Sequence, residues 1–160
     1  MIPRSAAPKR PPSVPKKAKL GDVTLEFMSL LWAVDHGLQS MSKRMKNELG
    51  VTGPQRVVVR MVGENPGISA GVLASLLKLH PSTLTGVLDR LVTRGVLQRV
   101  TDPADRRRAL FSLTPLGQLF NHLKDGTVES AVRKALERIE PEDLRVAKEV
   151  LNVIVEQLSP

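Results

Sequence analysis

Two stripes of apolar residues, spaced alternately by three and four, constrain this 160-residue chain more than any other feature. The stripes comprise Phe27, Leu31, Val34, Leu38, Met41 and Met45 near the start, and Leu144, Ala147, Leu151, Ile154 and Leu158 near the end. This spacing predicts one helix over about 23–48 and another that opens at Pro141, each with a narrow seam that needs a partner helix. We therefore expect a homodimer joined through its N- and C-terminal helices, with packing inside one chain as the alternative.

Charge is concentrated in the first twenty residues. The chain has 24 basic and 16 acidic side chains, a net charge of +8. Residues 1–20 hold six of the basic side chains, five prolines and no acidic residue, which predicts a disordered basic tail. An auxiliary phosphate-binding role for this tail stays open. Residues 21–160 are nearly neutral, so binding of a polyanion by the folded part must depend on where individual charges lie.

Composition disfavours several classes of protein. The absence of cysteine excludes a disulfide framework and a thiolate zinc site. One Trp, three Phe and no Tyr disfavour single-strand binders that stack bases on aromatic side chains. The sequence contains neither a secretory signal nor a run of eighteen apolar residues, so we expect a cytoplasmic protein without a membrane anchor.

Between the terminal stripes, short motifs mark where helices begin and end. Thr52 and Gln55 form a capping box that predicts a helix through the β-branched residues 57–59, and Asn65-Pro66-Gly67 ends it. Ser69 is positioned to cap a short third helix that ends near Leu79. A fourth helix is expected from Pro81 to Thr93, and its apolar face comprises Leu84, Val87, Leu88, Leu91 and Val92.

The opposite face of that fourth helix begins with small polar residues. These are Ser82, Thr83, Thr85 and Gly86, followed by Arg90 one turn later. A helix that approaches base edges in a major groove needs short hydrogen-bonding side chains at its tip. Two short helices joined by a tight turn, the second with such a tip, are typical of a helix-turn-helix.

A β-hairpin is expected directly after this helix. Alternating residues predict strands over 96–101 and 109–113, with Arg99 on the first, and turn-forming residues join them. The tip carries Arg106, Arg107 and Arg108, a narrow cationic projection that can enter a minor groove. Asp105 is expected to hold a neighbouring arginine by a forked salt bridge. The fold class is therefore mainly α with a small β-hairpin wing, a winged helix-turn-helix.

Several of these segments together resemble the MarR family of bacterial transcription regulators, over about residues 51–118. The segments are Thr52-Gly53-Pro54-Gln55, Pro81-Ser82-Thr83-Leu84-Thr85, Leu88-Asp89-Arg90-Leu91, Asp102-Pro103-Ala104-Asp105-Arg106-Arg107 and Leu113-Thr114-Pro115-Leu116-Gly117. The resemblance implies a triangular dimer that binds a pseudopalindromic operator in double-stranded DNA. It also implies that Arg107, paired with Asp105, reaches the minor groove, and that the residues at 82, 83, 85 and 86 face the major groove. Gly86 departs from the long polar side chain that the family often has there.

The remaining residues complete a domain over 21–160, with a DNA-binding lobe at about 51–114 and dimerisation helices at about 22–49 and 115–158. Thr114 caps a fifth helix with Leu116, Leu119, Phe120 and Leu123 expected on one side and a kink at Asp125-Gly126. In the resembled family, small anionic aromatic ligands often bind between the lobe and the helical bundle. Met28, Trp32 and His36 are the candidate lining residues, with core packing as the other interpretation.

Enzymatic functions find little support in the sequence. The three histidines, at 36, 80 and 122, lie in separate elements without a catalytic or metal-binding pattern, so we expect no catalytic residue, metal or cofactor. A Mg²⁺ nuclease using Asp102 and Asp105 and a winged helix for protein assembly are the alternatives, and the three wing arginines argue against both. The sequence thus predicts a sequence-specific DNA-binding regulator, and a repressor in particular because occluding a promoter needs only tight binding.

Overall fold

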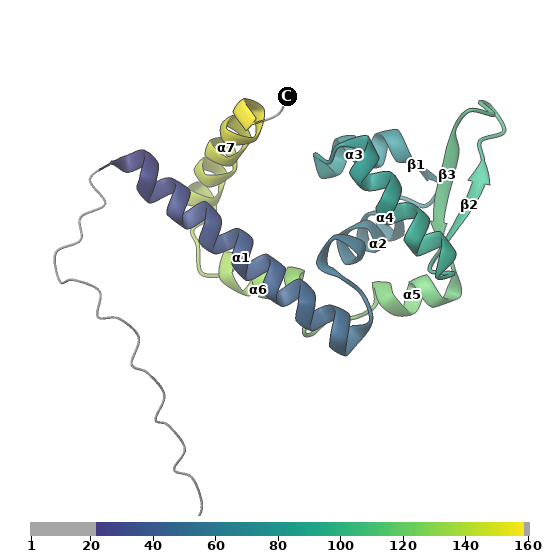
Figure 1. The fold of residues 1–160 in the computed structure, drawn as a ribbon, viewed down its shortest axis with the longest axis horizontal. Coiled ribbons are helices and arrows are strands. Elements are labelled where there is room, and N and C mark those ends of the chain that lie inside the picture. The colour runs from purple at the N-terminus through teal and green to yellow at the C-terminus, as the bar shows by residue number, and fades with distance from the viewer. Residues whose placement is uncertain (1–21, 159–160) are drawn as a thin grey trace, which may run out of the picture. The chain divides into compact units, whose positions relative to one another are not determined.

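A computed structural model describes residues 22–158, which form seven helices and three short strands (Figure 1). The helices are α1 (Val23–Leu49), α2 (Gly53–Glu64), α3 (Ala70–Leu77), α4 (Pro81–Thr93), α5 (Pro115–Asn121), α6 (Val128–Leu136) and α7 (Pro141–Leu158). The strands are β1 (Ile68–Ser69), β2 (Leu97–Thr101) and β3 (Ala109–Leu113), joined in one antiparallel sheet of order β1-β3-β2. The expected fold class is confirmed. The tail predicted over residues 1–20 lies outside the described residues.

Two compact units divide the chain inside α1, after Asp35. The first contributes only residues 22–35 to the described structure, and its apolar side chains there are largely exposed: Val23, Leu25, Phe27, Leu30, Trp32 and Val34. The second unit begins at His36 and contains every contact considered below.

The core of the second unit is formed by α2, α3, α4 and the sheet. Its fully buried side chains include Val58, Val62, Leu73, Leu91 and Val96. Helix α2 contacts α4, α5 and β3, and therefore lies at the centre of this lobe. These side chains form one hydrophobic core, which fixes α4 and the hairpin of β2 and β3 relative to each other (Figure 1).

Helix α2 shows how capping overrides local strand propensity. The Thr52 hydroxyl accepts the N–H of Gln55, and the Gln55 side chain accepts the N–H of Thr52, so the predicted capping box is present. Val58 and Val59 are completely buried inside the helix. Tertiary burial therefore outweighs the preference of a β-branched run for a strand.

Strand β1 is an element that the sequence analysis missed. It is two residues long, and Ile68 pairs with Phe111 while Ser69 pairs with Leu110. A two-residue strand is too short to show the alternation of a strand pattern. Its partner also lies more than forty residues away in the chain, so no local signal marks it. Its pairing makes β3 the central strand of the sheet.

The predictions for the fifth helix need correction. Phe120 packs against the core, but Leu116 and Leu119 are 42% and 69% exposed. The helix also faces the lobe through Gly117, where an added Cβ would collide with the Val96 carbonyl oxygen. The predicted kink is a complete break, since α5 ends at Asn121 and a new helix, α6, is capped by the Thr127 hydroxyl. Gly126, at φ +70°, supplies the turn before that cap.

Helix α7 has no buried residue over its eighteen positions. Val150, Leu151 and Val153 are between 39% and 59% exposed, although helices of this kind normally bury an apolar stripe. On its polar side Arg145 donates to both Glu142 and Glu149, and this hydrogen bonding lowers the pKa of Glu142 below its usual value. The helix is therefore regular and internally paired, but most of its apolar side chains are exposed in the described chain.

Candidate nucleic-acid interface

The first turn of α4 presents small polar side chains because the apolar residues of the helix face the core. Leu84, Val87, Leu88 and Leu91 are buried. Ser82, Thr83 and Thr85 are exposed, and an added Cβ at Gly86 would have no neighbouring atom within 4 Å. The tip of α4 is consequently uncrowded and open to a large partner.

His80 caps α4, a role that the sequence analysis did not assign. Its Nδ1 accepts the backbone N–H of Ser82 at 3.3 Å and lies 2.7 Å from the Ser82 Oγ. The Thr85 hydroxyl donates to the Pro81 carbonyl oxygen at 2.9 Å. The signal was available, since the residue before a proline in the first turn occupies the N-cap position. With its proton used inside the helix, the Thr85 hydroxyl oxygen remains available as an acceptor.

The wing is a hairpin with a structured turn. Strands β2 and β3 pair from Leu97 with Leu113 to Thr101 with Ala109. Within the turn Asp102 N–H donates to the Arg108 carbonyl, and Arg108 N–H donates to the Asp105 carbonyl, both at 2.9 Å. Arg106 and Arg107 are exposed. The hydrogen bonds give the loop a defined backbone from which these two side chains project.

Asp105 has a different partner from the one predicted. Its carboxylate accepts the backbone N–H of Arg107 at 3.0 Å, and the ion pairs found among residues 22–158 do not include a forked bridge from Asp105 to an arginine. Two residues of separation favour this Asx-type turn over a salt bridge, because the carboxylate already lies beside the backbone N–H. Asp105 therefore orders the backbone that carries Arg107 and leaves the guanidinium without a carboxylate.

Two other arginines are tied to the lobe. Arg108 lies 3.9 Å from an Asp102 carboxylate oxygen and donates to the Ser69 hydroxyl at 3.3 Å. Arg99 on β2 lies 4.0 Å from Asp89 on α4, and both side chains are more than half exposed. Such exposed pairs contribute little stability, so their main effect is to orient the two arginines.

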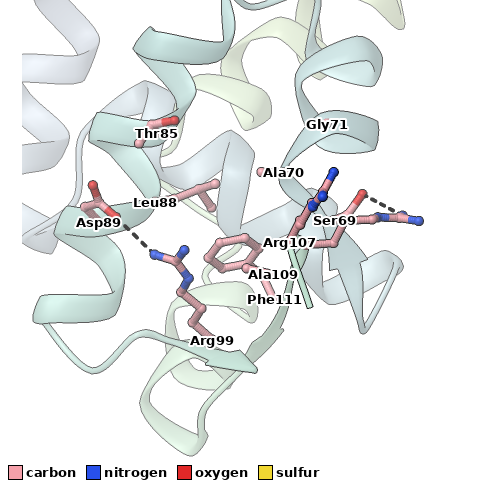
Figure 2. Close-up of a pocket in the computed structure, with 11 residues that line it drawn as sticks. Ser69, Ala70, Gly71, Thr85, Leu88, Asp89, Arg99, Arg107, Ala109 and Phe111 are labelled. Carbon is pink, nitrogen blue, oxygen red and sulfur yellow. Dashed lines mark hydrogen bonds and ion pairs between the residues drawn. The ribbon is translucent and has the colours of Figure 1, made fainter. Parts of the chain in front are cut away.

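A groove of about 300 Å³ lies between the outer face of α4 and the hairpin (Figure 2). It is lined by residues from five elements and the hairpin turn, including Thr85 and Asp89 of α4 and Arg99 and Arg107 of the hairpin. Phe111 and Leu88 form part of its apolar floor. The groove thus brings together Thr85 from the tip of α4 and three of the four hairpin arginines predicted for the interface, Arg99, Arg107 and Arg108.

A second cavity of about 530 Å³ lies against the other side of α4. Lys46, Gln55, Arg90 and Arg94 contribute to its lining, so three cations surround it and Asp89 is its one acidic lining residue. Arg94 is oriented by Gln55 Oε1 at 3.5 Å and by the Phe120 ring, whose centroid is 5.8 Å from the guanidinium carbon. Arg90, which the sequence analysis grouped with the α4 tip, therefore belongs to this cavity.

Comparison with known proteins gives consistent matches. The profile described as the MarR family matches residues 49–108. The transcriptional regulator HosA of Escherichia coli O111:H- is 36% identical over 81 residues, which are 50% of this chain and 60% of HosA. The organic hydroperoxide resistance transcriptional regulator of Bacillus subtilis is 28% identical over 130 residues, 81% of this chain and 86% of that protein. Residues 49–108 thus carry the pattern of the MarR family, and the chain is similar to curated transcriptional regulators.

Solved structures of MarR-family proteins have the same fold. Sco3205 from Streptomyces coelicolor, solved in complex with DNA, superposes with a TM-score of 0.72 at 20% identity and covers 93% of this chain and 94% of its own. PcaV from the same species, solved with its natural ligand, gives a TM-score of 0.71 at 22% identity over 89% and 100% of the two chains. The chain therefore has the winged helix-turn-helix fold of these solved regulators.

The residues that the MarR resemblance suggests for a ligand site are not among those that line the two cavities. Met28 and Trp32 are 37% and 65% exposed on the first unit, and His36 is exposed at the start of the second. The two cavities are lined by other residues. The assignment of Met28, Trp32 and His36 to a ligand site stays a prediction.

Residues 22–158 contain neither a cluster of metal-binding side chains nor a membrane-spanning helix. Within that range no three or more histidine, aspartate or glutamate side chains gather closely enough to hold a metal ion. Nor does any helix there combine the length and the apolar character needed to cross a membrane.

Proposed function

We propose that this protein is a sequence-specific regulator of the MarR family that binds double-stranded DNA. The main support for this proposal is the groove that Thr85 of α4 and Arg107 of the wing both line. A recognition helix in the major groove and a wing in the adjacent minor groove must act from one continuous surface, and these residues provide it. The proposed contacts are Ser82, Thr83, Thr85, Gly86, Arg90, Arg99, Asp105, Arg106, Arg107 and Arg108.

The bound form we propose is a homodimer on a pseudopalindromic operator. Support comes from α7, which buries none of its residues in one chain, and from exposed apolar residues on α6 such as Val132 and Leu136. A second copy is the partner that the heptad-like spacing of the terminal helices favours. Two copies then read half-sites about one helical turn apart, roughly 10 base pairs.

Repression is the regulatory mode that requires least of such a protein, since an occupied operator excludes the polymerase. The protein would act in the cytoplasm, where the DNA is, and would have no catalytic activity. The MarR-family relatives named above are regulators rather than enzymes, which agrees with this proposal.

Selection from a random duplex pool tests the proposal. The full chain should enrich an inverted repeat whose half-sites are about 10 base pairs apart. Arg107→Ala should enrich the same repeat more weakly. A pool that stays unenriched would instead favour the assembly module, in which the winged helix binds another protein.

A small anion that releases the protein from DNA would bind more favourably in the second cavity than beside Met28, Trp32 and His36. That cavity is surrounded by Lys46, Arg90 and Arg94, whereas Met28, Trp32 and His36 offer at most one cation. Benzoate serves as a simple aromatic carboxylate probe. It should weaken binding to the selected duplex for the wild type and have less effect on Arg94→Gln, and equal effects on both proteins would exclude this cavity as the site.

A further inference from the structure

Arg56 is the largest fully buried side chain of the described residues, although its neighbours in sequence gave no sign of it. It lies on α2 and is 2% exposed. Its guanidinium donates to three acceptors: a Glu129 carboxylate oxygen, the Phe120 carbonyl oxygen and, at 2.7 Å, the Leu123 carbonyl oxygen. One side chain of the lobe therefore binds both the end of α5 and the first turn of α6.

The two carbonyls that Arg56 binds belong to the point where the chain leaves the lobe. The last carbonyls of a helix have no partner within the helix and need an outside donor. Here the planar fork of an arginine supplies donors to the end of α5 and to the segment that follows it. The direction in which the chain departs after Asn121 is thereby coupled to α2.

Glu129 completes the connection from the other side. It lies in the first turn of α6, where Thr127, fully buried, caps the helix through Ser130 N–H. The backbone N–H of Val128 points at the sulfur of Met45, which is 1% exposed on α1. The start of α6 is consequently enclosed by groups from α1 and α2.

The ion pair is poorly suited to a purely stabilising role. The second carboxylate oxygen of Glu129 is buried without a hydrogen-bond partner. Removing two charges from water costs about as much as their attraction returns unless every remaining group is satisfied. The pair instead fixes the orientation of α6 relative to α2, because a guanidinium and a carboxylate bind in one preferred geometry.

We infer that Arg56 is a positioning residue that sets the spacing between the two recognition helices of the dimer, and hence the half-site spacing of the operator. This inference rests on the proposed function. Helices α6 and α7 carry the exposed apolar side chains assigned to the dimer, while α2 supports α4. Arg56 is the buried side chain that joins α2 to α6.

Spacing is a sensitive quantity for such a dimer. One added base pair displaces a half-site by about 3.4 Å and rotates it by roughly 34° about the DNA axis. A rigid junction between α2 and α6 cannot follow both the displacement and the rotation of the half-site, whereas a loosened junction can. Removing the Arg56 contacts should therefore relax the choice of spacer length more than it weakens the recognition of each half-site.

The test uses the full chain and a set of duplexes that differ only in the spacer of the selected inverted repeat. The main variant, Arg56→Met with Glu129→Leu, replaces both charges by apolar side chains so that neither is left buried alone. Glu129→Gln is a milder variant that keeps an acceptor for Arg56. Arg60→Met is the matched control, because Arg60 lies on the same helix and contacts Asn121 and Glu64 but not α6.

The wild type and Arg60→Met should lose about tenfold or more in affinity when the spacer changes by one base pair, the order of cost of a mismatched base pair. The double variant should lose about threefold or less, and Glu129→Gln should fall between them. Melting curves establish that each variant is folded.

Two results overturn the inference. One is a folded double variant that keeps the tenfold preference of the wild type; the other, where the double variant does not fold, is Glu129→Gln with an unchanged preference. A wild type that binds no inverted repeat would instead refute the proposed function, so the two failures are distinguishable.

Discussion

Between Gly53 and Leu113 the apolar side chains of α2, α3, α4 and the sheet pack into one closed core, in which Leu73 and Leu91 are fully buried. Along α7 the same kinds of side chain remain exposed, and Leu151 is 49% accessible in one chain. Both regions carry the amphipathic pattern of stable helices. The pattern therefore predicts a buried face in each region. The lobe buries that face within the chain, whereas α7 has no buried residue there.

This difference separates two kinds of stability. Contacts of the lobe form in each chain, so their loss should lower stability at every protein concentration. Contacts of α7 form with a second copy in our proposal, so their loss should matter according to concentration.

Leu91→Ala should lower the free energy of unfolding by about 2–5 kcal/mol, because it leaves a cavity in the closed core of the lobe. Urea denaturation at several protein concentrations measures this loss, which should not change with concentration. Leu151→Ala is the matched truncation on α7, and its cost should instead depend on concentration. Equal and concentration-independent losses in both variants would refute the distinction.

Gly117→Ala should destabilise the protein by about 1–3 kcal/mol, since its Cβ would overlap the backbone oxygen of Val96 where α5 meets the lobe. Gly86→Ala is the control in a helix with open space, and it should stabilise by up to about 1 kcal/mol. Thermal melts of the two variants should shift in opposite directions. A neutral Gly117→Ala would mean that α5 is not held tightly against the lobe.

Arg107→Ala should weaken binding to the selected operator by about 1–3 kcal/mol while leaving the melting temperature unchanged, since its side chain is exposed and has no carboxylate partner in the turn. Arg106→Ala, a neighbouring exposed cation, should lose less, because a phosphate contact is shared among sequences. Titration of operator and random duplex at one salt concentration makes the comparison. Identical losses on both duplexes would remove Arg107 from sequence recognition.

Asp105→Ala should weaken operator binding by about 1 kcal/mol, less than Arg107→Ala, because the wing turn loses the hydrogen bond that orders the Arg107 backbone. Simple electrostatics predicts the opposite sign, since a negative charge near DNA is removed. The same titration decides between them. Tighter operator binding would show that the Asp105 turn does not order the wing for DNA.

Much of the lobe could be predicted from sequence because its signals are local. The capping pair Thr52 and Gln55, the cap Thr114 and the apolar spacing of α4 each act within a few residues. The same holds for the exposed tip of α4, since its polar residues are what remains when the apolar face is buried. These features follow from periodicity and capping alone.

The features that escaped prediction depend on partners far along the chain. Strand β1 exists only because β3 pairs with it, and Arg56 is buried only because the end of α5 and Glu129 lie against it. In sequence, Arg56 reads as a solvated charge beside Gln55. The close approach of Gly117 to the Val96 carbonyl was likewise hidden, since no local pattern marks a glycine that packs against a distant backbone oxygen.

The central claim is that two copies of the lobe, joined through the terminal helices, read one operator. Sedimentation of the full chain with a duplex bearing the selected inverted repeat tests it most directly, alongside a duplex of equal length with one half-site. We expect two chains on each inverted repeat and much weaker binding to the single half-site. One chain per duplex, with equal affinity for both, would contradict it.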